Sequence, residues 1–130
     1  MREKQWLVIV AALALVALVG CATIQPGADP VLVRAEQALV VSFETVDAFL
    51  RVEHENQHAL DEVVPGAHAV AESMRTRGPA SFRALEAAIT AYRAHRTPER
   101  RATLITWLAV CEQLAHDAQA ILAAWGGGAR

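Results

Sequence analysis

Five consecutive residues, His54-Glu55-Asn56-Gln57-His58, have the types and the spacing of a zinc-binding sequence, H-E-x-x-H. On an α-helix, histidines four positions apart face the same way and can share one zinc ion, and the glutamate can serve as general base on metal-bound water. Glu62 extends this spacing, so that His54, His58 and Glu62 form a ladder that could bind a transition metal loosely. The segment could therefore support metal binding or metal-assisted hydrolysis.

The segment resembles the zinc metalloproteases over these five residues, but the sequence around it departs from that family. Arg51 stands where the family usually has Val or Thr, and neither Gly nor His follows at the spacing of the extended motif. No strand is predicted that could bind a substrate along its edge. His58 lies among Glu53, Glu55 and Asp61, a composition typical of a solvated helix face. We therefore favour a structural role, with no catalytic residue and no cofactor, and a metal-binding protein or zinc-dependent hydrolase is the alternative.

A second group of residues with possible chemistry, Leu18-Val19-Gly20-Cys21, closes a segment that has the three parts of an export signal. Arg2 and Lys4 make the start basic, and the uncharged run from Trp6 to Val19 is shorter than the roughly 20 residues that span a bilayer. The four closing residues resemble the lipobox of bacterial lipoproteins. That resemblance implies diacylglyceryl modification of Cys21 and cleavage before it. An uncleaved anchor helix is the alternative.

The lipobox assignment predicts the compartment as well as the anchor. Acyl chains such as palmitate hold a protein stably when two are present, because each buried methylene contributes roughly 0.8 kcal/mol. We expect the domain to face the periplasm or the cell exterior. Ala22, rather than Asp, follows the cysteine, which in lipoproteins of Gram-negative bacteria favours the outer membrane.

Composition limits what the rest of the chain can be. Without residues 1–20, 110 residues remain, enough for one small domain. They contain ten Arg, no Lys and thirteen acidic residues, a net charge of −3, which gives no electrostatic basis for nucleic-acid binding. Cys111 is left without a disulfide partner, and its helical spacing from Leu104 and Leu108 predicts a buried thiol. His68 has no evident partner.

Helix signals predict an all-α fold. Asp29-Pro30 and Thr97-Pro98 each place a capping residue before a proline at the first helical position. The first helix should run to about Glu62. Its expected buried stripe consists of Leu32, Ala35, Leu39, Phe43, Val46 and Leu50. Helices at about 67–75 and 80–95 should flank Gly78-Pro79, and the last helix should stop at Gly126-Gly127-Gly128.

Charge and helix length predict the packing. Residues 29–72 have a net charge of −7 and residues 73–101 a net charge of +5, so the first helix should lie beside the middle section. We expect an up-down helical bundle of three long columns, the middle one broken at Gly78-Pro79, with four helices as the alternative. The chain is thus divided into a signal peptide (1–20), a lipidated cysteine and linker (21–29), a helical bundle domain (30–125) and a C-terminal tail (126–130).

In length, lipobox and helical content the chain is similar to small helical lipoproteins encoded in bacterial and phage genomes. This similarity implies a lipid-anchored, non-enzymatic structural or interaction module of the cell envelope. Its expected partners are the membrane, through the lipid on Cys21, and a protein of the cell envelope.

Overall fold

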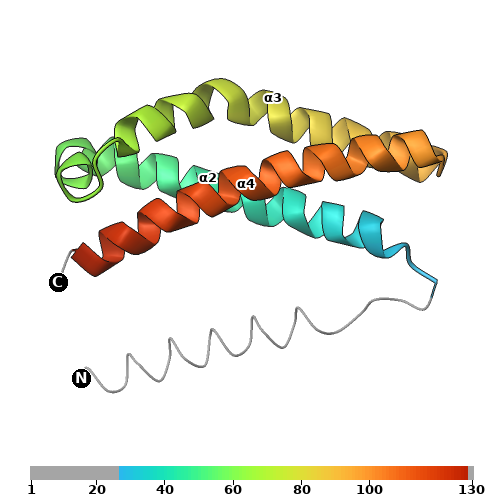
Figure 1. The fold of residues 1–130 in the computed structure, drawn as a ribbon, viewed down its shortest axis with the longest axis horizontal. Coiled ribbons are helices and arrows are strands. Elements are labelled where there is room, and N and C mark those ends of the chain that lie inside the picture. The colour runs from blue at the N-terminus through green and yellow to red at the C-terminus, as the bar shows by residue number, and fades with distance from the viewer. Residues whose placement is uncertain (1–26, 129–130) are drawn as a thin grey trace, which may run out of the picture. The chain divides into compact units, whose positions relative to one another are not determined.

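The computed structural model describes residues 27–128, which contain three helices and no strand (Figure 1). Helix α2 spans Pro30–Val63, α3 spans Ala67–Ala94 and α4 spans Pro98–Gly128. The helices from Val31 onward belong to one compact unit. The predicted signal peptide, Cys21 and most of the linker lie outside the described residues. Within the described range, no helix is both long enough and apolar enough to cross a membrane.

The helix starts predicted at Pro30 and Pro98 are confirmed. α2 begins at Pro30 and α4 at Pro98, and the Thr97 hydroxyl accepts a hydrogen bond from the backbone N–H of Arg100 at 3.3 Å. This bond satisfies one of the N–H groups that the first turn of a helix leaves unpaired.

The turn between α2 and α3 depends on Gly66 and Asp61. Gly66 has a φ of 86°, a left-handed conformation in which a Cβ would be strained. The Asp61 carboxylate accepts hydrogen bonds from the backbone N–H groups of Gly66 at 3.1 Å and His68 at 3.4 Å. A negative charge at this position also suits the positive end of the α3 dipole. Asp61 therefore caps α3.

The middle column is one continuous helix, so the predicted break at Gly78-Pro79 and the alternative of four helices are wrong. α3 passes through Pro79 and arches along its length (Figure 1). A proline removes one helical hydrogen bond and crowds the preceding turn, which bends a helix when packing holds both halves in place. Met74, before the proline, and Leu85, after it, are both buried in the same core.

The last helix is longer than predicted. α4 continues through Gly128 instead of ending at residue 125. At Gly128 an added Cβ would lie 2.6 Å from Val63 Cγ1, so the end of α4 passes very close to the end of α2. Glycine fits this close approach because it has no side chain.

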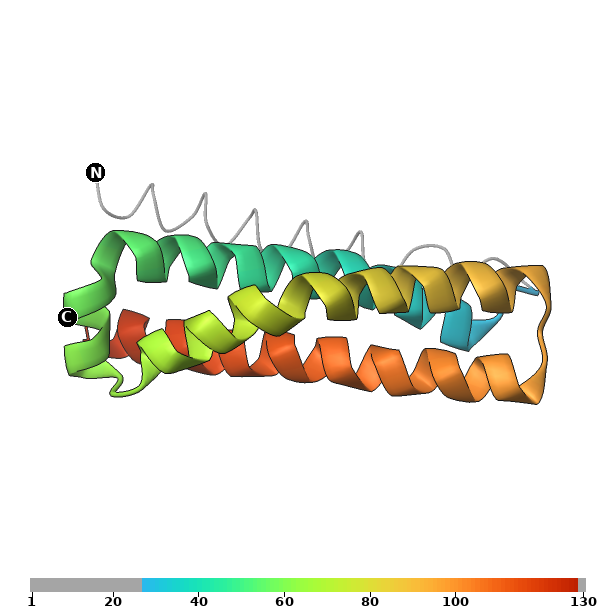
Figure 2. The same ribbon diagram turned by 90° about the horizontal axis from the view of Figure 1, so that it is seen from above.

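The helices form an up-down-up bundle, in which α3 runs antiparallel to both α2 and α4 (Figures 1 and 2). One core is shared by all three helices, and its largest fully buried apolar side chains are Phe49, Leu60, Met74, Leu85, Leu104 and Cys111. The predicted attraction between the acidic first helix and the basic middle section is seen in an ion pair between Glu36 of α2 and Arg93 of α3. Arg34 of α2 forms a bidentate ion pair with Glu112 of α4, in which Nη2 of the guanidinium lies 2.9 Å from each carboxylate oxygen.

Candidate functional site

The H-E-x-x-H segment does not have the regular helical geometry that its zinc chemistry requires. Asn56, between the two histidines, has φ −128° and ψ 25°, which is not helical. Its side-chain amide donates to the Val52 carbonyl at 3.0 Å, a bond that competes with the backbone for the carbonyl four residues earlier. His54 and His58 are therefore separated by a kink, and both are exposed, as expected of a solvated face.

No group of three or more His, Cys, Asp or Glu residues within the described chain is arranged so that it could hold a metal ion. Glu62, the third member of the proposed ladder, is exposed near the end of α2. Asp61, another acid close to His58 in the sequence, accepts hydrogen bonds from the backbone at the start of α3.

Because His54 and His58 are exposed, the double substitution His54→Ala/His58→Ala is expected to change the stability only modestly. Exposed substitutions typically shift the free energy of unfolding by about 0.5 kcal/mol per site. Urea unfolding of a version of the chain that starts at Ala22 would measure this change. A loss of several kcal/mol would show that the histidines have structural partners.

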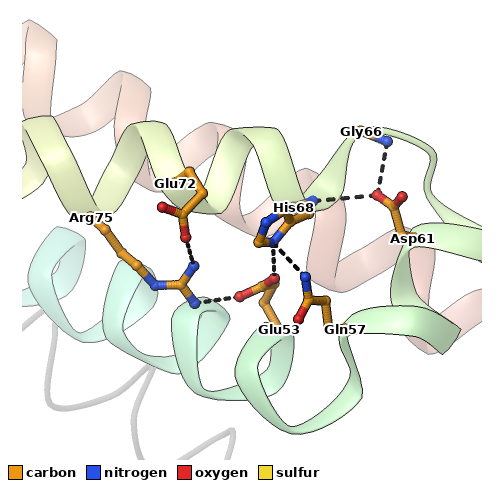
Figure 3. A network of polar contacts seen from close by, with 7 residues as sticks. All are labelled: Glu53, Gln57, Asp61, Gly66, His68, Glu72 and Arg75. Atoms are coloured by element: carbon orange, nitrogen blue, oxygen red, sulfur yellow. Dashed lines mark hydrogen bonds and ion pairs between the residues drawn. The ribbon is translucent and has the colours of Figure 1, made fainter.

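Glu53 was predicted to lie on a solvated face, and this prediction is wrong: its side chain is 2% exposed. Two α3 side chains converge on its carboxylate (Figure 3). His68 Nδ1 lies 2.7 Å from one carboxylate oxygen, and the Arg75 guanidinium pairs with the other. His68, for which the sequence offered no partner, therefore holds Glu53, and Glu72 contacts the outer side of Arg75 at 2.5 Å.

The cluster keeps a negative charge inside the bundle. Burial raises the pKa of Glu53, but hydrogen bonds from His68 and Arg75, together with their charges, outweigh burial and hold that pKa below its ordinary value. The same contact with Glu53 raises the pKa of Arg75. A buried charge is tolerated only when it is paired and hydrogen-bonded, and no buried side-chain nitrogen or oxygen among the described residues lacks a partner. The arrangement is that of a structural ion cluster which fixes α3 on α2.

The lowered pKa of Glu53 predicts acid sensitivity. Since the unfolded chain binds a proton at Glu53 more readily than the folded one, the cluster stabilises the fold above the ordinary glutamate pKa, about 4.3. This contribution is lost as the pH falls through the lower pKa of the folded state. Glu53→Gln should therefore be less stable than the wild type at pH 7 and lose less stability between pH 7 and pH 3. Urea unfolding across this range tests the prediction, which parallel pH profiles would contradict.

Cys111 is fully buried on α4, as predicted. Its Sγ donates to the backbone carbonyl of Ser81 on α3 at 3.6 Å, and burial raises the pKa of the thiol to about 11. Because the thiolate is the nucleophile and metal ligand, Cys111 is protonated and inert at neutral pH. It joins α3 to α4 by packing.

We expect Cys111 to resist thiol reagents in the folded protein. In a version of the chain that starts at Ala22 it is the remaining cysteine, so an aromatic disulfide reagent at pH 8 should find no reactive thiol until urea is added. One thiol per chain should then react. Rapid reaction of the folded protein would show that the α3–α4 interface opens readily.

An open groove of about 760 Å³ lies between α2 and α3. Its apolar lining consists of Leu39, Val40, Phe43, Val46, Leu50, Met74, Pro79 and Phe82. Val40 and Phe43 are 56% and 57% exposed, so the prediction that Phe43 belongs to the buried stripe is wrong. The Phe43 ring packs edge-on against Phe82, with ring centroids 5.7 Å apart. The two rings join α2 and α3 across the groove.

Charged residues of both helices also line the groove. Glu44 and Asp47 lie on the α2 side, and Arg75, Arg83 and Glu86 lie on the α3 side. Asp47 pairs with Arg51 of its own helix, and Arg75 pairs with Glu53. The groove therefore combines an apolar lining with charged residues on an α2 rim and an α3 rim, as a protein interface with a hydrophobic centre does.

Comparison with family models, curated proteins and solved structures finds no match for this chain. The groove and the buried cluster are therefore the features of this chain that bear on its function.

Proposed function

We propose that this chain is a lipid-anchored, non-enzymatic interaction module of the bacterial cell envelope, which binds a partner through the groove between α2 and α3. The observation that carries this proposal is the exposure of Val40 and Phe43 beside a continuous apolar lining. Fully burying one valine or phenylalanine side chain contributes roughly 1.5–3 kcal/mol. A partner that covered the groove would gain this energy from several side chains together.

The anchor is the second part of the proposal. Leu18-Val19-Gly20-Cys21 supports lipidation of Cys21, because all four positions agree with the lipobox pattern. A diacylglyceryl group would hold the bundle at the membrane surface without a spanning helix. In cells, labelled palmitate should enter the wild type and be absent from Cys21→Ser. Equal labelling of the two would contradict lipidation at this residue.

Binding at the groove can be tested in intact cells that express the full chain. A photoreactive amino acid placed at Val40 should give a protein adduct after illumination. The same amino acid at Val110, an exposed apolar position on α4 that does not line the groove, is the matched control. An adduct at Val40 that is absent at Val110 would support the proposal, and equal or absent adducts at both positions would contradict it.

A further inference from the structure

We propose that the partner of the groove is a second copy of this chain. The two grooves face each other across a two-fold axis parallel to the bundle, and Glu44 of each copy pairs with Arg83 of the other. This inference rests on the proposed function, because it identifies the partner that occupies the same groove.

The positions of Glu44 and Arg83 are fixed by the aromatic contact across the groove. Phe43 and Phe82 touch, with an angle of 75° between their ring planes, so these residues lie at the same level of the bundle. Glu44 and Arg83 each follow one of the two rings in the sequence, and both are exposed and line the groove. No ion pair or side-chain hydrogen bond within residues 27–128 involves either of them. One rim thus presents an acid at the level where the other presents a base, and neither is paired with another of the described residues.

A two-fold axis parallel to the helices matches these charges. Rotation about this axis places α2 of one copy over α3 of the other and keeps each residue at its level along the bundle. Glu44 then meets Arg83 twice, because a two-fold interface forms each contact in duplicate. An axis perpendicular to the helices would instead place α2 over α2 and bring acidic rims together, which is unfavourable. The charge pattern therefore selects a parallel arrangement.

The size of the face suits a stable dimer. α3 has 28 residues, so it is about 42 Å long at roughly 1.5 Å per residue. Two helices lying side by side, each about 10 Å across, present a face about 20 Å wide. The face therefore measures on the order of 800 Å² per copy, which is close to the area that each partner buries in a standard stable interface.

The parallel arrangement is also compatible with lipid anchoring. It places the first turn of α2 at the same end of both copies, so both N-terminal anchors can enter one membrane. Attachment to the same membrane raises the effective concentration of each copy for the other, which strengthens a contact that would be weaker in solution. In the perpendicular arrangement the two α2 starts would be at opposite ends of helices of 34 residues, about 50 Å apart.

Reversing the charges of Glu44 and Arg83 by substitution tests the inference in cells. The full chain is expressed in two versions with different C-terminal tags, each carrying the photoreactive amino acid at Val40. The wild type should give an adduct that contains both tags. Glu44→Arg in both chains, or Arg83→Glu in both chains, should reduce this adduct about tenfold or more, because each dimer would contain two like-charge contacts; tenfold corresponds to about 1.4 kcal/mol.

Co-expression of one Glu44→Arg chain with one Arg83→Glu chain should restore the adduct, because both contacts between the unlike chains then join opposite charges. Restoration by mixing cannot result from misfolding of either variant. Insensitivity to the substitutions, or no recovery on mixing, would overturn the inference. If position 40 is crosslinked to a different protein, the inference that a second copy is the partner is wrong, whereas the proposed function is still supported. No protein adduct would overturn both.

Discussion

Replacing Arg75 by alanine is expected to lower the free energy of unfolding by about 3 kcal/mol near neutral pH. The loss follows from the carboxylate that remains: Glu53 is 2% exposed and would retain only the contact with His68 Nδ1. Removing one partner of a buried ion pair typically costs 3–5 kcal/mol, because the other charge stays buried. We place the value at the lower end of this range because Arg75 itself is 33% exposed and water can enter the space it leaves.

The matched control for Arg75→Ala is Arg51→Ala. Arg51 pairs with Asp47 on the same helix, and the two side chains are 74% and 44% exposed. Because exposed ion pairs contribute little to stability, this substitution should have a far smaller effect. Urea unfolding of both variants at pH 7 measures the difference. Adding Glu53→Gln to Arg75→Ala should recover part of the loss, since a neutral amide is less costly to bury. Equal effects of the two arginine substitutions would contradict a buried cluster.

The cluster could not be predicted because its pairing depends on which side of α2 faces α3. In the sequence, Glu53 stands among other acids near the end of a helix, and His68 follows a turn. Glu53 and His68 are 15 positions apart. They come into contact only because the turn at Gly66 folds α3 back onto α2. Local sequence patterns identify the two helices and the turn, but they do not give the rotation of one helix against the other.

The helix starts were predictable because their causes are local. A capping residue followed by proline marks both Pro30 and Pro98, and both helices begin there. The kink at Asn56 and the continuity of α3 through Pro79 were not predictable from the same signals. Whether a proline ends or bends a helix depends on the packing of the two halves, which is a property of the whole bundle.

The buried face of α2 was predicted only in part. The face that enters the core includes Ser42 and Glu53, and these polar residues hide its apolar periodicity. Leu39, Phe43 and Leu50 form a second apolar line that borders the groove. α2 is therefore apolar over a wider arc than its neighbours in the bundle cover. This excess supports the proposal that a partner binds there.

Replacing Phe49 or Phe43 by alanine distinguishes an effect on the stability of the fold from an effect on binding at the groove. Phe49 is 0% exposed, so Phe49→Ala should lower the free energy of unfolding by about 4 kcal/mol, through lost burial and the cavity left behind. Natural domains have a total stability of roughly 5–15 kcal/mol, so this loss would greatly increase the fraction of unfolded molecules.

Phe43→Ala removes the same atoms from a side chain that is 57% exposed. It should cost only about 1 kcal/mol, because the main loss is the edge contact with Phe82. The crosslink from Val40 should nevertheless weaken strongly, since an exposed aromatic anchor contributes to binding more than to folding. Urea unfolding and crosslinking of both variants measure the two effects separately. A Phe43→Ala variant that unfolds as readily as Phe49→Ala would place Phe43 in the core and remove the main support for a binding groove.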